Sequence, residues 1–174
     1  MAPLTVRRYG DPVLRRKAEP VTAVTAEIQR LIDQMIETMY HDLGIGLAAP
    51  QVGIPLRVIV VEDELGKGPT ALINPVITVS RGQVVGEEGC LSLPGIFGDV
   101  VRAEWLSVSA QNRDGQPVSF EARELLARVI QHEIDHLDGV LFIDRLDKAQ
   151  RDRIKRKIKK EGLPDEAPHH ALAL

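Results

Sequence analysis

The sequence predicts an α+β domain in which antiparallel or mixed β-sheets are wrapped around a central, buried helix. Two observations favour this class: most expected strands precede the second long helix, and no regular βαβ alternation occurs. The second helix is also apolar on most sides, which is typical of a buried helix. An amphipathic helix near the N-terminus and a basic helix near the C-terminus complete the expected architecture.

Apolar periodicity defines the two long helices. The first begins after Thr25, a suitable N-cap, and should stop before Gly44; its apolar positions recur every three or four residues, at Ile28, Leu31, Ile32, Met35, Ile36, Met39 and Tyr40. The second is expected over about 121–138, with Gly139 as its C-terminal cap. Its apolar positions lie around most of its circumference, at Leu125, Leu126, Val129, Ile130, Ile134 and Leu137.

Strands are expected in four segments. A compact β-branched run covers 56–61, and a second strand covers 71–80 but is broken by Asn74-Pro75. The alternating segment 105–111 is followed by a turn and by residues 118–120, so these two segments should form a hairpin.

Composition limits the class of protein. The chain has 174 residues, of which 44% are hydrophobic, and this is enough for one domain with a real core. A single cysteine excludes an internal disulfide framework and suits a reducing compartment. Because we find no signal peptide and no apolar run of about 18 residues, we expect a cytoplasmic protein with no membrane contact.

The segment His132-Glu133-Ile134-Asp135-His136 predicts a metal site on the second helix. Residues at this histidine spacing are about 40° apart around a helix and about 6 Å apart along it, so both imidazoles can reach one ion. Glu133 is close enough to act on a water at the metal without being a ligand. The pattern can arise by chance, but buried charge needs a partner, and the apolar helix therefore favours a metal.

The third ligand decides the class of metallohydrolase. Zinc proteases of the H-E-x-x-H-x-x-G-x-x-H type use a third histidine, but Phe142 stands at that position. Proteases that use a distant glutamate would need a residue such as Glu161, which follows a basic segment. Cys90 is the better candidate, because two histidines and one thiolate leave a fourth position open for water. Without the histidines, a lone buried cysteine would be interpreted as a small apolar residue.

Three segments together closely resemble the signature motifs of bacterial peptide deformylases, in the same order and at similar spacing. They are Gly44-Ile45-Gly46-Leu47-Ala48-Ala49-Pro50-Gln51, Glu88-Gly89-Cys90-Leu91-Ser92 and Gln131-His132-Glu133-Ile134-Asp135-His136-Leu137. By itself the first segment would be an ordinary connecting loop, since no strand precedes it as dinucleotide binding requires. The resemblance covers roughly residues 4–146. It implies a catalytic domain over 1–146, a basic helix over 147–160 and a polar tail, expected to be disordered, over 161–174.

The resemblance implies that the protein hydrolyses the formyl group from the N-terminal formylmethionine of newly synthesised polypeptides and releases formate. N-formylmethionyl nascent peptides are therefore the expected partners. Glu133 would take a proton from the nucleophilic water and deliver it to the departing amine. The side-chain amide of Gln51 and the backbone N–H of Leu91 would stabilise the oxyanion.

The resemblance also implies a metal and a substrate groove. Cys90, His132 and His136 would hold one divalent ion per chain, with ferrous iron as the working metal and zinc or nickel as substitutes. Their imidazole and thiolate groups alone do not choose among these metals. By analogy with the family, the residues that bind substrate are Ile45, Gly46 and Gly89 for its backbone and Leu125 and Val129 for the methionine side chain.

Residues 147–160 carry eight basic residues and two acidic ones, a formal balance of +6 in a chain of net charge −3. One interpretation is a solvated helix whose Ile154 and Ile158 touch the body of the protein. The other is docking onto RNA, since bacterial deformylases are similar in using a basic C-terminal helix to sit near the ribosomal exit. We expect no DNA partner. His169 and His170 lie in the polar tail and are not expected to be ligands.

Two alternative functions stay open. An H-E-x-x-H peptidase predicts that Cys90→Ala keeps its metal. A non-enzymatic RNA-binding module stabilised by a metal predicts that Glu133→Ala changes nothing beyond local stability.

Overall fold

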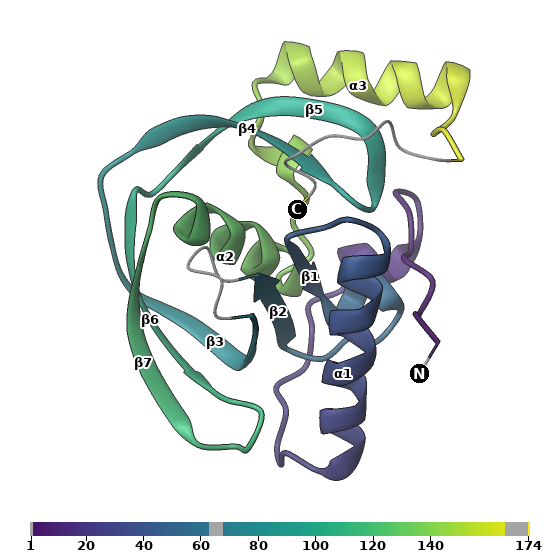
Figure 1. Ribbon diagram of the computed structural model, residues 1–174. Helices are drawn as coiled ribbons and strands as arrows, with labels where there is room; N and C mark the ends of the chain where they lie inside the picture. Colours follow the sequence, from purple (N-terminus) through teal and green to yellow (C-terminus); the bar gives the residue numbers. More distant parts are fainter. Residues whose placement is uncertain (1, 63–67, 166–173) are drawn as a thin grey trace.

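The computed structural model describes residues 2–62, 68–165 and 174. Within these residues it is an α+β fold with antiparallel sheets and three α-helices (Figure 1). The helices are α1 (Ala26–His41), α2 (Glu124–Leu137) and α3 (Lys148–Glu161). The strands are β1 (Gly46–Ala48), β2 (Val58–Glu62), β3 (Pro69–Arg81), β4 (Val84–Cys90), β5 (Leu93–Arg102), β6 (Trp105–Gln111) and β7 (Pro117–Arg123). Short 3-10 helices cover Pro12–Arg15, Ala49–Val52 and Phe142–Arg145.

Two separate sheets lie close to α2. Five strands form one sheet in the order β1-β2-β3-β6-β7, and β4 and β5 form a two-stranded sheet. Every neighbouring pair is antiparallel. Helix α2 contacts β1, β2, β6 and β7, while β4 and β5 pass between α2 and α3 (Figure 1). Strand β1 carries part of the first signature segment, β4 ends at Cys90 in the second, and α2 carries the third. The three signature segments therefore meet at α2.

The N-terminal amphipathic helix is confirmed as α1. The Thr25 hydroxyl accepts a hydrogen bond from the Ile28 N–H at 3.4 Å, as an N-cap does. The inward face of the helix carries Ile32, Met35 and Met39, which are fully buried and pack with residues of β1, β2 and β3. This packing fixes α1 against one face of the large sheet.

The expected break at Asn74-Pro75 was wrong, because β3 continues through it. The pairing of β3 with β6 shifts register between Ile73 and Val76, which marks a bulge. Asn74 adopts a left-handed φ of 50°, and its side chain makes two hydrogen bonds of 2.9 Å with the backbone of Val21. Proline has no N–H to pair and is tolerated at such a position. The strand therefore bends there instead of ending.

Helix α2 starts later than its apolar periodicity predicts. Residues 121–123 still belong to β7, where Glu121 pairs with Ser107 and Arg123 with Trp105. The predicted hairpin is thus confirmed and is longer than expected. Gly139 follows the helix with a φ of 75°, the left-handed conformation that favours glycine after a helix.

The basic C-terminal helix is confirmed as α3. Asp147 is its N-cap and accepts a hydrogen bond from the Gln150 N–H at 2.8 Å. The expected tail falls partly on residues 166–173, including His169 and His170, which lie outside the described residues. At Leu174 the structure differs from a disordered tail, because this side chain is buried. No helix in the described ranges is long and apolar enough to cross a membrane.

Candidate metal centre

The three predicted metal ligands lie together. Cys90 ends β4, and His132 and His136 lie one turn apart on α2; all three are buried. One ligand atom from each residue lies within 4.8 Å of the others. His136 Nε2 is 3.2 Å from His132 Nε2 and 3.4 Å from Cys90 Sγ. One thiolate and two imidazole nitrogens at these distances can share one ion.

The pKa shifts of Cys90 and His136 are consistent with a cation-binding site. Burial raises the pKa of the Cys90 thiol, and the carboxylate of Glu133 raises it further. Burial lowers the pKa of His136, and the neighbouring His132 adds to this effect. Without an ion both shifts favour the neutral forms of Cys90 and His136, whereas a bound divalent cation deprotonates a coordinating thiol. A neutral imidazole is already the form that binds a metal.

Behind His132 lies a buried carboxylate that the sequence analysis missed. Glu88 Oε1 is 2.9 Å from His132 Nδ1, which leaves Nε2 facing the other ligands. The same carboxylate accepts hydrogen bonds from Arg102 at 2.8 Å and from Arg128 at 2.7 Å. Burial by itself would raise the pKa of Glu88, but the hydrogen bonds with Arg102 and His132 hold it well below its usual range. Glu88 therefore stays ionised and orients the imidazole of His132.

The ion-pair cluster extends away from the metal ligands. Arg102 also donates to Asp135 at 2.6 Å, and Asp135 accepts two further hydrogen bonds from Arg145. These residues come from β5, α2 and the 3-10 helix Phe142–Arg145. We define the Glu88 cluster as Glu88, Arg102, Arg128, Asp135 and Arg145. It ties β4, β5 and α2 together behind the metal ligands.

In front of the ligands, Glu133 has an apolar setting. Both of its carboxyl oxygens are buried, and neither has a hydrogen-bond partner among the described residues. Burial raises the pKa of Glu133 well above its usual value, and the negative charge of Glu88 raises it further. A Cβ on Gly46 would lie 2.5 Å from Glu133 Oε2, so only glycine lets β1 come this close. A carboxyl with a raised pKa can exchange a proton near neutral pH.

Gln51 and Ser92 form a polar contact beside Cys90. The buried Gln51 side chain accepts from the Ala48 N–H at 3.0 Å, which orients its amide group. Its Nε2 donates to Ser92 Oγ at 3.1 Å and lies 3.6 Å from Cys90 Sγ. The structure thus places the predicted amide donor at the metal ligands. It adds Ser92, the last residue of the second signature segment, as a contact that the sequence analysis did not identify.

The predicted substrate residues are distributed around these groups. Gly46 lies against both Glu133 and Val129, and Val129 is buried. Ile45 is half-buried just before β1 and accepts from the Glu62 N–H at 2.9 Å. Gly89 precedes Cys90, where a Cβ would lie 2.6 Å from the Phe97 ring. Leu125 is more exposed and borders a cavity of about 310 Å³.

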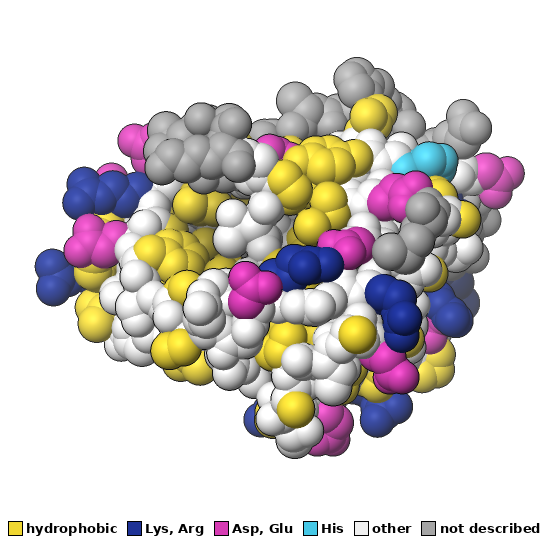
Figure 2. Space-filling view, turned by 60° about the horizontal axis from the view of Figure 1, so that its bottom comes forward, with side chains coloured by type: hydrophobic (Ala, Val, Ile, Leu, Met, Phe, Trp, Pro, Cys, Tyr) yellow, Lys and Arg dark blue, Asp and Glu magenta, His cyan; other side chains and the backbone are white. Residues whose placement is uncertain are grey.

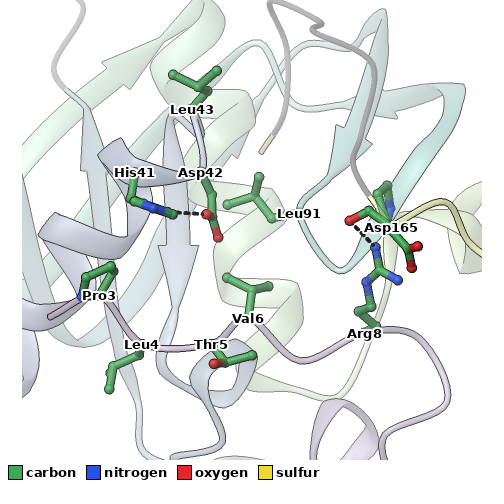
Figure 3. Close-up of a pocket in the computed structure, with 11 residues that line it drawn as sticks. Pro3, Leu4, Thr5, Val6, Arg8, His41, Asp42, Leu43, Leu91 and Asp165 are labelled. Carbon is green, nitrogen blue, oxygen red and sulfur yellow. Dashed lines mark hydrogen bonds and ion pairs between the residues drawn. The ribbon is translucent and has the colours of Figure 1, made fainter.

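Leu91 connects the centre to a second pocket of about 630 Å³ (Figure 3). The pocket lies between the N-terminal segment around Leu4 and the residues that follow α1, including Asp42 and Leu43. On its far side Arg8 donates hydrogen bonds to the backbone oxygens of Pro164 and Asp165. The side chain of Leu91, the residue after Cys90, therefore lines this pocket.

Comparison with known proteins identifies the family. The family model described as polypeptide deformylase matches residues 3–152. The chain belongs to the peptide deformylase family. A peptide deformylase of Halothermothrix orenii is 53% identical over 146 residues, covering 84% of this chain and 95% of the relative. The crystal structure of a peptide deformylase from Legionella pneumophila matches with a TM-score of 0.86 and 43% identity, covering 91% of this chain and 95% of that chain.

Peptide deformylases are metal-dependent hydrolases that remove the N-formyl group, and this chain is an enzyme of that class. A peptide deformylase of Thermodesulfovibrio yellowstonii is 48% identical over 162 residues, covering 91% of this chain and 98% of the relative. The similarity therefore extends over nearly the full length of both proteins.

Proposed function

We propose that Cys90, His132 and His136 hold one divalent metal and that Glu133 is the general acid and base of the deformylase reaction. The observation that carries the proposal is the convergence of the three ligand atoms within 4.8 Å beside a buried carboxyl with no partner among the described residues. When bound, the metal supplies Lewis acidity to a water and to the formyl carbonyl. In this account α2 is the central helix around which the sheets are arranged.

In the proposed mechanism Glu133 moves the protons. Its carboxylate takes one from the attacking water, and the resulting carboxylic acid delivers one to the amine as formate leaves. The raised pKa of Glu133 suits both steps, because the group must accept and then release a proton. The apolar contact with Gly46 and Val129 keeps other hydrogen-bond donors away from the carboxyl.

We assign oxyanion stabilisation to Gln51 and Leu91. The Gln51 amide is held by the Ala48 N–H and lies next to Cys90, so its donor is oriented before substrate binds. The backbone N–H of Leu91 follows Cys90 directly in the chain. Preorganised donors of this kind are each worth about 10²–10³ in rate.

The substrate in this proposal is an N-formylmethionyl peptide that binds as an added strand. Ile45, Gly46 and Gly89 offer backbone groups on either side of the ligands, and strand addition uses such groups. Leu125 and Val129 lie on α2 one or two turns before the ligand His132, and we assign them to the methionine side chain. A linear apolar side chain suits such a pocket.

We propose ferrous iron as the working metal. One thiolate and two imidazoles also accept zinc, cobalt and nickel, so metal availability decides among them. An iron–thiolate site is sensitive to oxygen, because oxidation of the thiolate removes a ligand. We therefore expect activity to decay in air with iron and to persist with nickel or zinc.

The basic helix α3 is proposed to dock the catalytic domain, residues 1–146, near the ribosomal exit. Most basic side chains of α3 are exposed, whereas Ile154 and Ile158 pack against the body of the protein. Figure 2 brings forward the end of the molecule opposite α3, and there acidic and basic side chains are intermixed. The mixed charges of this face contrast with residues 147–160, which carry eight basic and two acidic residues. Because its substrates would be nascent polypeptides, we place the enzyme in the cytoplasm.

Ribosome co-sedimentation tests this docking at physiological salt. Charge reversal on α3 should weaken binding, because phosphate contacts are lost, and the variant is Lys155→Glu with Arg156→Glu and Lys157→Glu. A matched control reverses the same number of exposed charges elsewhere, with Arg16→Glu, Lys17→Glu and Arg30→Glu. Equal binding of both triple variants would contradict docking through α3.

The enzymatic proposal is tested by formate release from formyl-Met-Ala-Ser under anaerobic conditions. We expect the wild type to be active with iron or nickel, and Cys90→Ala to lose both bound metal and activity. A Cys90→Ala variant that keeps its metal would favour the peptidase alternative. A wild type that binds metal but releases no formate would contradict the deformylase function.

A further inference from the structure

The C-terminal residue Leu174 is buried in the candidate site. Only 1% of its surface is exposed, and the C-terminal end lies beside α2 and β1, away from the end of α3 (Figure 1). Leu174 belongs to the same apolar cluster as Val129 and Ile130 of α2. A leucine in this position shows what kind of residue the site accepts.

The backbone of Leu174 is paired with β4 on either side of Cys90. Its N–H donates to Gly89 O at 3.2 Å, and its backbone oxygen, which belongs to the terminal carboxylate, accepts from the Leu91 N–H at 3.1 Å. One residue that bonds to both neighbours of another residue has the pattern of a parallel strand pair. Leu174 therefore adds to the edge of β4 in the manner of an extended peptide.

The side chain of Leu174 lies against the residues assigned to the methionine pocket. It borders the cavity of about 310 Å³ together with Leu125 and Arg128. Leucine and methionine have similar volumes and replace one another in apolar sites at little cost. A site that encloses Leu174 is therefore suited to the side chain of formylmethionine.

We propose that Leu174 occupies the substrate groove of its own chain and competes there with the formylmethionyl residue. The inference rests on the proposed function, which makes this groove the substrate site. Leu91 has one N–H, and while it donates to Leu174 it cannot donate to the substrate. Substrate thus binds only the fraction of molecules in which Leu174 has left. Occupancy of about nine in ten would raise KM about tenfold and leave kcat unchanged.

Substitution of Leu174 tests the competition through the separate values of KM and kcat. Leu174→Asp places a charge in the apolar groove and should release it, so KM should fall several-fold while kcat stays the same. Leu174→Met is the matched control and should keep the KM of the wild type, because methionine suits the same pocket. Equal KM values in all three proteins would overturn the proposal.

A binding measurement separates this inference from the proposed function. N-acetyl-L-leucine carries the same side chain, an N–H and a terminal carboxylate, and calorimetry gives its Kd without any turnover. The Kd should be lower for Leu174→Asp than for the wild type, by the factor seen in KM. If no variant releases formate, the deformylase proposal fails, but the two Kd values still decide whether Leu174 fills the groove. Equal Kd values would overturn self-occupancy.

Discussion

Two buried glutamates on opposite sides of α2 have pKa values that are shifted in opposite directions. On one side Glu88 is surrounded by Arg102, Arg128 and His132, and its pKa is held below the usual range. On the other side Glu133 lies near Gly46 and Val129 without a hydrogen-bond partner among the described residues, and its pKa is raised. Both carboxyls are fully buried, so the surroundings and not burial make the difference.

The two glutamates differ in what their surroundings allow them to do. A carboxylate held by two guanidinium groups does not change its protonation during a reaction, but it can fix the orientation of a ligand. A carboxyl without such partners can gain and lose a proton. We therefore assign Glu88 to positioning and Glu133 to proton transfer.

The largest expected effect comes from breaking the Glu88 cluster. Glu88→Ala leaves Arg102 and Arg128 buried without their shared carboxylate and should lower the free energy of unfolding by about 3–5 kcal/mol. It should also weaken metal binding by about 10–100-fold, because His132 loses its orienting partner. Denaturant unfolding and metal titration measure the two effects.

The control for Glu88→Ala is Glu104→Ala, at an exposed carboxylate outside the cluster. It should leave both the stability and the metal affinity close to those of the wild type. Similar losses in the two variants would show that the Glu88 cluster has no special role.

A smaller change is expected from crowding the Glu133 side. In Gly46→Ala the new Cβ would lie 2.5 Å from Glu133 Oε2 and 2.8 Å from a methyl group of Val129, so the carboxyl must move. Misplacement of a catalytic group by about 1 Å can cost about 100-fold in rate. Formate-release kinetics should therefore show a lower kcat with unchanged metal content. An unchanged kcat would mean that the position of Glu133 is not critical.

The smallest effect should come from a carboxylate outside both regions. Burial by itself would raise the pKa of Asp144, but hydrogen bonds from Arg15 and the Leu141 N–H lower it below its usual value. The ionised group thus contributes stability above its unfolded pKa, and this contribution is lost as the pH falls through the lower folded pKa. Because Arg15 is exposed, Asp144→Asn should cost only about 0–1 kcal/mol at pH 7.

Thermal unfolding of Asp144→Asn and the wild type across the acid range measures this contribution. The two proteins should converge as the pH falls from the usual pKa of an aspartate, about 4, through the lower pKa of the folded wild-type carboxyl. A difference that grows on acidification would contradict the sign of the shift.

The sequence predicted the elements that rest on local pattern. Helix α1 and the hairpin of β6 and β7 follow from apolar periodicity. Motif spacing and a lone cysteine predicted three metal ligands, and the structure brings the ligand atoms of these residues within 4.8 Å of one another. The hairpin of β4 and β5 was missed, because glycines such as Gly86, Gly89 and Gly98 interrupt the alternation that would mark a strand.

Long-range contacts could not be predicted from spacing. The Glu88 cluster joins side chains from β4, β5, α2 and a later 3-10 helix, and no local pattern relates Glu88 to Arg102 or Asp135. The sequence signal for Glu88 was its place in the second signature segment, two residues before Cys90. Leu174 was missed for the same reason, since its partners Gly89 and Leu91 are far away in the chain.

The most direct test of the account is the variant Glu133→Gln, loaded with metal under anaerobic conditions. Glutamine keeps the shape of the side chain but cannot accept the proton of a water. We expect bound metal to stay at the wild-type level while kcat for formate release falls by about 10²–10⁴. Wild-type kcat in this variant would contradict proton transfer by Glu133, and loss of the metal would show that Glu133 holds the ion.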